Sequence, residues 1–167
     1  MGINKERPHL HLLPEDDQDA DLAKGFLLHL KENWRTVPVM VLPPPGGWLK
    51  ALEYFRDNLI ADMRRCKGRR TVIVIDFDED DDRRRKAQSF IPDDVADRVF
   101  VVGSWKEPKD LKKAFGLNCE AIGRKIAGEC VAGECVNYTG NSWEHPLLDH
   151  NAGEVRRLGP LVRELVS

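Results

Sequence analysis

The sequence lacks the long apolar run that a membrane-spanning helix needs. Such a helix requires about 20 consecutive, mostly apolar residues, and no stretch of these 167 residues approaches that length. The amino terminus, MGINKERPHLHLLPEDD, also lacks the apolar region of an ordinary secretory signal peptide. Both absences favour a cytoplasmic protein that has no membrane partner.

Cysteine is scarce, and none of the four cysteines belongs to a C-x-x-C pair. We therefore interpret them as free thiols of a reducing compartment. The G-x-G-x-x-G and Walker patterns of nucleotide-binding loops are absent as well. No internal repeat or low-complexity segment is visible, so the chain is expected to form one ordinary globular unit.

Charge is abundant but nearly balanced, and its clustering is informative. The chain has 26 basic and 28 acidic residues, a net charge of -2, and 41% hydrophobic residues. Acids concentrate at residues 15–21 and 76–82, and bases concentrate at 64–70 and 83–86. An acidic centre between basic clusters suits a metal site that acts on a polyanion. Each basic cluster alone is equally well explained as a solvated face.

The most informative stretch is TVIVIDFDEDDD, residues 71–82. Its five apolar or β-branched residues are typical of a strand buried on both faces. Because a buried strand does not tolerate an unpaired charge, the acids that follow must lie where the strand emerges. Side chains two residues apart share one side of a strand, so we expect Asp76 and Asp78 to lie side by side and to repel by about 1 to 4 kcal/mol. This arrangement predicts a divalent metal site.

Alternating patterns along the chain predict an α/β fold. Strand patterns cover 9–13, 37–42, 71–75 and 99–102; helical patterns cover 22–34, 48–66, 108–115, 119–130 and 143–166, and Ile91 to Asp94 is typical of a helix start. Helical connections of this length call for a mainly parallel sheet. We therefore expect a Rossmann-like, mainly parallel four-stranded sheet flanked by helices over residues 1–104. Residues 105–167 are expected to be a helical C-terminal extension packed on the same domain.

Acidic residues also follow the first strand pattern. Glu15 stands directly after it, as Asp76 stands after the third. Asp16, Asp17 and Asp19 begin the next helix, where acids stabilise the positive end of the helix dipole, so capping is their expected role. The pair at Gly46 and Gly47 would let backbone N–H groups approach a phosphate at the following helix start.

A glutamate after the first strand and an Asp-x-Asp after the third resemble the TOPRIM domain of topoisomerases, primases and OLD-type nucleases. The resemblance covers residues 8–104. Glu15 matches the family's glutamate, Asp19 matches the second acid of many nuclease members, and Asp76 and Asp78 match the Asp-x-Asp. The chain departs from the family where glycine is usual, with Asp16 after the glutamate and acids after the Asp-x-Asp.

The resemblance implies a Mg²⁺ or Mn²⁺ site that acts on phosphodiesters in the manner of a nuclease. Glu15, Asp76 and Asp78 would be catalytic, and these three residues with Asp19 would hold the metal. The basic residues expected to follow a nucleic-acid backbone are Arg83, Arg84, Arg85, Lys86, Arg69 and Arg70. Positional candidates for the further acids and base of a nuclease are Glu107, Asp110 and Lys106.

Two other interpretations stay open. The acids after the first strand, Asp76 after the third and Ser104 after the fourth also resemble response-regulator receiver domains, in which Asp76 would be the phosphoacceptor. A fifth strand ending in Lys-Pro, which those domains carry, is not evident. The chain also resembles small stand-alone TOPRIM-like bacterial proteins, some encoded beside ATPases. A non-catalytic subunit of a partner ATPase or nucleic-acid complex is therefore the third interpretation, and the long tail around Trp143 favours it.

Overall fold

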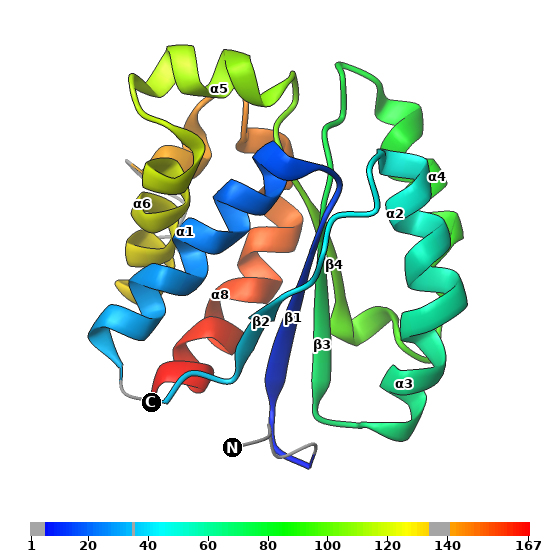
Figure 1. The fold of residues 1–167 in the computed structure, drawn as a ribbon. Coiled ribbons are helices and arrows are strands. Elements are labelled where there is room, and N and C mark those ends of the chain that lie inside the picture. The colour runs from blue at the N-terminus through cyan, green and yellow to red at the C-terminus, as the bar shows by residue number, and fades with distance from the viewer. Residues whose placement is uncertain (1–5, 35, 134–140) are drawn as a thin grey trace.

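One parallel sheet forms the centre of the protein. The computed structural model describes residues 6–34, 36–133 and 141–167. Strands β1 (His9–Pro14), β2 (Val39–Val41), β3 (Arg69–Val74) and β4 (Val99–Val102) lie in the order β2-β1-β3-β4, and every neighbouring pair is parallel (Figure 1). The expected α/β class and four-stranded parallel sheet are confirmed.

Helices occupy most of the connections between the strands and most of the segment after β4. They are α1 (Asp17–Asn33), α2 (Trp48–Tyr54), the π-helical turn η1 (Phe55–Leu59), α3 (Ile60–Arg65), α4 (Asp81–Ser89), α5 (Pro108–Phe115), α6 (Cys119–Val131) and α8 (Ala152–Val166). Short 3-10 turns are η2 (Ala96–Arg98), η3 (Ser142–Glu144) and η4 (Asp149–Asn151). Within the described ranges, none of the helices has the length and apolar character needed to cross a membrane.

The expected helix start at Ile91 to Asp94 is wrong. Helix α4 lies earlier, because Asp80 caps it by accepting a hydrogen bond from the Asp82 N–H at 2.9 Å. After α4 ends at Ser89, the chain reaches β4 through turns and η2. The acidic and basic run after β3 is therefore helical, and the segment that follows it is not.

Two helical layers cover the two faces of the sheet (Figure 1). Alternate strand residues such as Leu12, Val74 and Val102 pack in one core cluster with residues of α1, α6 and α8. Their neighbours Ile73 and Val101 pack in a second cluster with residues of α2, η1, α3 and α4. This alternation is the expected geometry of strands buried on both faces.

Helix α6 packs on α1 with backbone contacting backbone. A Cβ atom added at Gly25 would lie 1.9 Å from the Glu120 carbonyl oxygen, and one added at Gly123 would lie 2.1 Å from the Leu22 carbonyl oxygen. Only glycine permits so close an approach. The two helices therefore form one tightly joined layer over the sheet.

Side chains at the start of α8 cover the free edge of β4. The Val101 N–H donates to the Glu154 carboxylate at 2.7 Å, and Arg157 donates to the Val99 carbonyl at 2.7 Å. The Asn151 side chain accepts from the Gly103 N–H at 3.2 Å and donates to the Gly103 carbonyl at 2.9 Å. An edge strand normally presents unpaired backbone groups, so the C-terminal segment completes the sheet.

The winding of the chain marks where a ligand would bind. From β1 the chain moves outward to β2, and it then returns to the other side of β1 to form β3. Ligands of open α/β sheets bind outside the carboxyl ends of the strands, at the point where the winding reverses. Here that point lies between β1 and β3, the strands that Glu15 and Asp76 follow.

Candidate metal centre

Three buried carboxylates meet at this point. Glu15 comes from the end of β1, Asp76 from the end of β3, and Asp19 from the first turn of α1. Each offers an oxygen, and the three oxygens lie within 4.8 Å of one another. The residues are 8%, 7% and 0% exposed, respectively. We call these three residues the carboxylate triad.

Backbone groups hold Glu15 in place. Its carboxylate accepts a hydrogen bond from the Asp76 N–H at 2.7 Å, and its own N–H donates to the Val74 carbonyl at 2.8 Å. Its carbonyl accepts from the N–H groups of Gly46 and Gly47 at 2.9 and 3.1 Å. The two glycine N–H groups, expected to approach a phosphate, therefore bond to Glu15 instead.

Asp16 and Asp19 have different roles at the start of α1. Asp16 caps the helix, and its carboxylate accepts from the N–H groups of Gln18 and Asp19 at 3.1 and 3.0 Å. Asp19 turns inward: among the described residues, no partner bonds to either of its carboxylate oxygens or to Oδ1 of Asp76. A buried charge without a partner is strongly unfavourable. The triad therefore requires either protons or a cation.

The pKa values of the triad show the same requirement. Burial, as the largest cause, raises the pKa of Asp76 to about 8, and the charges of Glu15 and Asp16 raise it further, while the neighbouring Asp19 carboxyl and Arg83 act against them. Burial also raises the pKa of Asp19 well above its ordinary value, with Asp76 as the next cause, and raises that of Glu15. At neutral pH the metal-free triad keeps protons that a divalent cation would replace. Three carboxylate oxygens suit hard ions such as Mg²⁺ and Mn²⁺.

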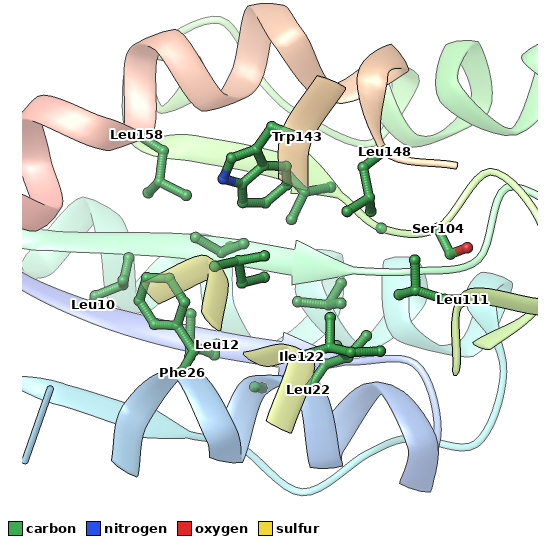
Figure 2. Close-up of a pocket in the computed structure, with 16 residues that line it drawn as sticks. Leu10, Leu12, Leu22, Phe26, Ser104, Leu111, Ile122, Trp143, Leu148 and Leu158 are labelled. Atoms are coloured by element: carbon green, nitrogen blue, oxygen red, sulfur yellow. The ribbon is translucent and has the colours of Figure 1, made fainter. Parts of the chain in front are cut away.

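An unpaired hydroxyl lies beside the triad. Ser104 is fully buried, and its Oγ has no hydrogen-bond partner in the part of the chain that the structure describes. Val74 pairs with Val102, and the Phe77 N–H donates to the Ser104 carbonyl at 3.0 Å. This register makes Asp76 and Ser104 neighbours on one face of the sheet. Figure 2 shows the hydroxyl pointing away from a small apolar core cavity of about 60 Å³, toward the carboxyl ends of the strands.

Asp78 lies apart from the triad. The strand ends at Val74, and the backbone becomes left-handed at Asp78 and Glu79, with φ of 49° and 57°. The alternation of a strand no longer applies there, and the Asp78 side chain is 62% exposed. The expected side-by-side pair of Asp76 and Asp78 is therefore not formed, and Asp19 occupies the place beside Asp76.

Two members of the triad, Glu15 and Asp76, line an open cleft of about 330 Å³, the acidic cleft. Its lining residues are Glu15, Asp16, Gln18, Trp48, Asp76, Asp78, Arg83, Glu107, Pro108 and Lys109. Of the positional candidates after β4, Glu107 lines it, whereas Lys106 pairs with Glu79 at 3.8 Å. Trp48 and Lys109 were not expected at the site. Only their position in the sequence could have indicated them, because each lies on a helix that follows a parallel strand.

The basic run on α4 divides between the cleft, the core and the surface. Arg83 lines the cleft. Arg84 instead points inward, where it donates to His150 at 2.9 Å and lies 4.6 Å from the centre of the Phe77 ring. Arg85 and Lys86 are exposed on α4. The four consecutive bases therefore do not form one nucleic-acid surface.

Arg69 and Arg70 lie at the opposite edge of the sheet. They begin β3, whereas Asp76 follows its end. Arg69 donates to His9 at 3.2 Å, and Arg70 donates to the Gly68 carbonyl at 2.7 Å. A strand rises about 3.3 Å per residue, which puts these backbones about 20 Å from the triad. A phosphate held at the triad cannot also contact either arginine.

Comparisons of the chain with protein-family models, curated proteins and solved structures found no match. The buried carboxylates of the triad supply oxygen ligands and, among the described residues, lack a positively charged partner, so they can hold a divalent cation. That cation would face a ligand bound in the adjoining cleft.

Proposed function

We propose that this protein is a divalent-metal-dependent enzyme of the nuclease type, which hydrolyses phosphodiesters with Mg²⁺ or Mn²⁺ held by Glu15, Asp19 and Asp76. The observation that carries the proposal is that both buried carboxylate oxygens of Asp19 and Oδ1 of Asp76 have no hydrogen-bond partner among the described residues. Carboxylates in this state are stabilised by a cation. The position at the winding reversal and the resemblance of the acid spacing to TOPRIM domains add support.

The metal ion and the protein residues would have different roles in the reaction. A bound divalent ion lowers the pKa of water and stabilises charge on phosphoryl oxygens. Asp76 N–H keeps the Glu15 carboxylate aimed at the triad, at 2.7 Å. In hydrolysis the water oxygen forms a bond to phosphorus, the ester P–O bond breaks, and one water proton ends on the leaving oxygen. Asp78, exposed on the wall of the cleft, is placed to relay that proton.

A simple phosphodiester, bis(p-nitrophenyl) phosphate, tests this proposal. We expect wild-type protein to release p-nitrophenol when Mn²⁺ or Mg²⁺ is present and to stop when EDTA is added. Asp76→Asn should reduce the rate by about 100-fold or more, as loss of a metal ligand does at hydrolytic sites. The control is Asp82→Asn, which removes an exposed carboxylate from α4. Equal metal-dependent rates for wild type and Asp76→Asn would refute the proposal.

A receiver-like phosphoacceptor is the second candidate, because Ser104 places an unpaired hydroxyl next to Asp76. In that function Asp76 would accept a phosphoryl group from a small donor such as acetyl phosphate. Intact-protein mass spectrometry would show an added phosphoryl group that Asp76→Asn cannot carry. A mass that stays unchanged in the presence of Mg²⁺ and acetyl phosphate would eliminate this candidate.

A further inference from the structure

The guanidinium of Arg83 is fixed above the carboxylate triad. It donates to the Asp76 carbonyl at 2.9 Å and to the Asp78 carboxylate at 3.5 Å, and it lies 4.8 Å from the centre of the Trp48 ring. Its side chain is 19% exposed. A side chain already held by three contacts loses little conformational freedom when it binds a ligand.

Arg83 retains capacity for an anion. A guanidinium carries several N–H donors in one plane, and the two hydrogen bonds to Asp76 and Asp78 leave others without an acceptor among residues 6–34, 36–133 and 141–167. Planar donors of this kind suit phosphate oxygens. Arg83 also lines the same cleft as Glu15 and Asp76. A ligand that bridges a metal at the triad and Arg83 must be negatively charged.

Two buried polar groups next to the cleft-lining residue Asp76 have no hydrogen-bond partner among the described residues. Asp19 is fully buried with both carboxylate oxygens unpartnered, and the fully buried Ser104 hydroxyl is likewise unpartnered within the described chain. Ser104 carries no charge, so it is independent of the acidic cluster. Buried polar groups normally have hydrogen-bond partners, and these two would gain theirs from a cation and its bound waters.

The surroundings of the cleft do not suit a long polyanion. Of the described residues that line it, only Arg83 and Lys109 are cationic, and Lys109 is paired with Glu107 at 2.9 Å. Asp16 and Asp78 add negative charge to the walls. Binding along a nucleic-acid backbone requires a row of cations that neutralises successive phosphates. The volume of about 330 Å³ matches the small end of ligand pockets.

We infer that the cleft binds one phosphoryl group at a time, between the metal of the carboxylate triad and the guanidinium of Arg83. The substrate is then a small or terminal phosphate ester and not the continuous backbone of a duplex. This inference rests on the proposed metal-dependent function, and it assigns Arg83 as the residue that recognises the anion.

Calorimetric titration of inorganic phosphate into Mg²⁺-saturated protein tests the inference. Wild type should bind phosphate, and Arg83→Gln should weaken its affinity by about tenfold or more. Arg83→Lys, which keeps the charge but loses the planar donors, should lie between them. The matched control is Arg85→Gln on the same helix, where the arginine is exposed and pairs with Asp82, and its phosphate affinity should equal that of wild type. Mg²⁺ affinity, measured without phosphate, should stay within about threefold in every variant.

The outcomes separate the inference from the proposed function. If wild type binds no Mg²⁺, both the inference and the proposed function are refuted. If wild type binds Mg²⁺ but no phosphate, or if Arg83→Gln binds phosphate as wild type does, the inference alone is overturned. It is also overturned if a duplex oligonucleotide binds more tightly than a nucleoside monophosphate and Arg85→Gln weakens that binding.

Discussion

Asp76→Asn should stabilise the metal-free protein. The pKa of Asp76 rises from its ordinary value of 3.8 to about 8, chiefly through burial. Between these values the folded state holds a proton that the unfolded state has released, so stability falls as pH rises from about 4 to about 8. At about 1.4 kcal/mol per pH unit, the cost at pH 7 is about 4 kcal/mol. Asparagine carries no charge there and avoids this cost.

Urea unfolding at several pH values measures the effect. At pH 7 to 8 with EDTA, we expect Asp76→Asn to exceed wild type by about 2 to 4 kcal/mol, and we expect the difference to vanish near pH 4. Asp78→Asn is the matched control, since Asp78 is largely exposed and should change stability by less than about 0.5 kcal/mol.

Addition of metal should close most of the gap between the two proteins. At a Mn²⁺ concentration 100 times its Kd, wild type should gain about 2.7 kcal/mol, or about 5 to 11 °C in Tm for a chain of this size. Asp76→Asn should gain much less, because it lacks one ligand of the triad. If Asp76→Asn is less stable than wild type at pH 8 without metal, the Asp76 carboxylate has a stabilising partner and the reasoning is wrong.

Three further predictions concern the rest of the fold. Burial lowers the pKa of His11 from 6.5 to about 4. Between these values only the unfolded state takes up the proton, so the free energy of unfolding should fall by up to about 3 kcal/mol as pH drops from 6.5 to 4. Urea titrations should show a smaller fall in His11→Gln, and an equal fall in both proteins would argue against this origin. Gly123→Ala should lower stability by about 1 to 3 kcal/mol or more, since its Cβ would collide with the backbone of α1, whereas Gly153→Ala, with open space around it, should be neutral or stabilising in thermal melts. Asn151→Ala should cost about 1 to 3 kcal/mol by leaving both backbone groups of Gly103 unpaired, and amide exchange at Gly103 should quicken; unchanged exchange would contradict that role.

Much of the fold could be predicted because each strand has its own local pattern. The apolar run from Thr71 and the short run at Val99–Val102 are buried on both faces, so their composition alone identified them. Glu15 and Asp76 were found at the sheet edge for the same reason, as carboxylates directly after such runs. Helix α4 was harder to predict, because a stretch of consecutive charged residues has no apolar periodicity.

The membership of the triad depended on features that a sequence pattern does not carry. An acid in the first turn of a helix stabilises its dipole wherever it points, and only the packing of α1 on the sheet turns Asp19 inward. The pairing of Asp76 with Asp78 failed because the chain adopts left-handed φ values at Asp78 and Glu79, which non-glycine residues seldom adopt. No local rule predicts that turn.

The positions of some basic residues could have been predicted from the sequence, and those of others could not. Arg69 and Arg70 begin the third strand and Asp76 follows its end, so strand direction alone places the two arginines at the edge opposite the triad. Arg84 offered no such signal, because its partner His150 lies 66 residues away along the chain. Charge clustering in sequence therefore overstated the basic surface near the site.

Calorimetric titration of Mn²⁺ into wild type, Asp19→Asn and Asp17→Asn would show whether the carboxylate triad binds a metal. Both variants remove one carboxylate from the first turn of α1, but Asp19 is fully buried in the triad and Asp17 is exposed. We predict one Mn²⁺ per chain for wild type and Asp17→Asn at equal affinity, and binding weakened by about tenfold or more in Asp19→Asn. Equal affinity in Asp19→Asn and wild type, or no binding to wild type at millimolar Mn²⁺, would contradict a metal centre at the carboxylate triad.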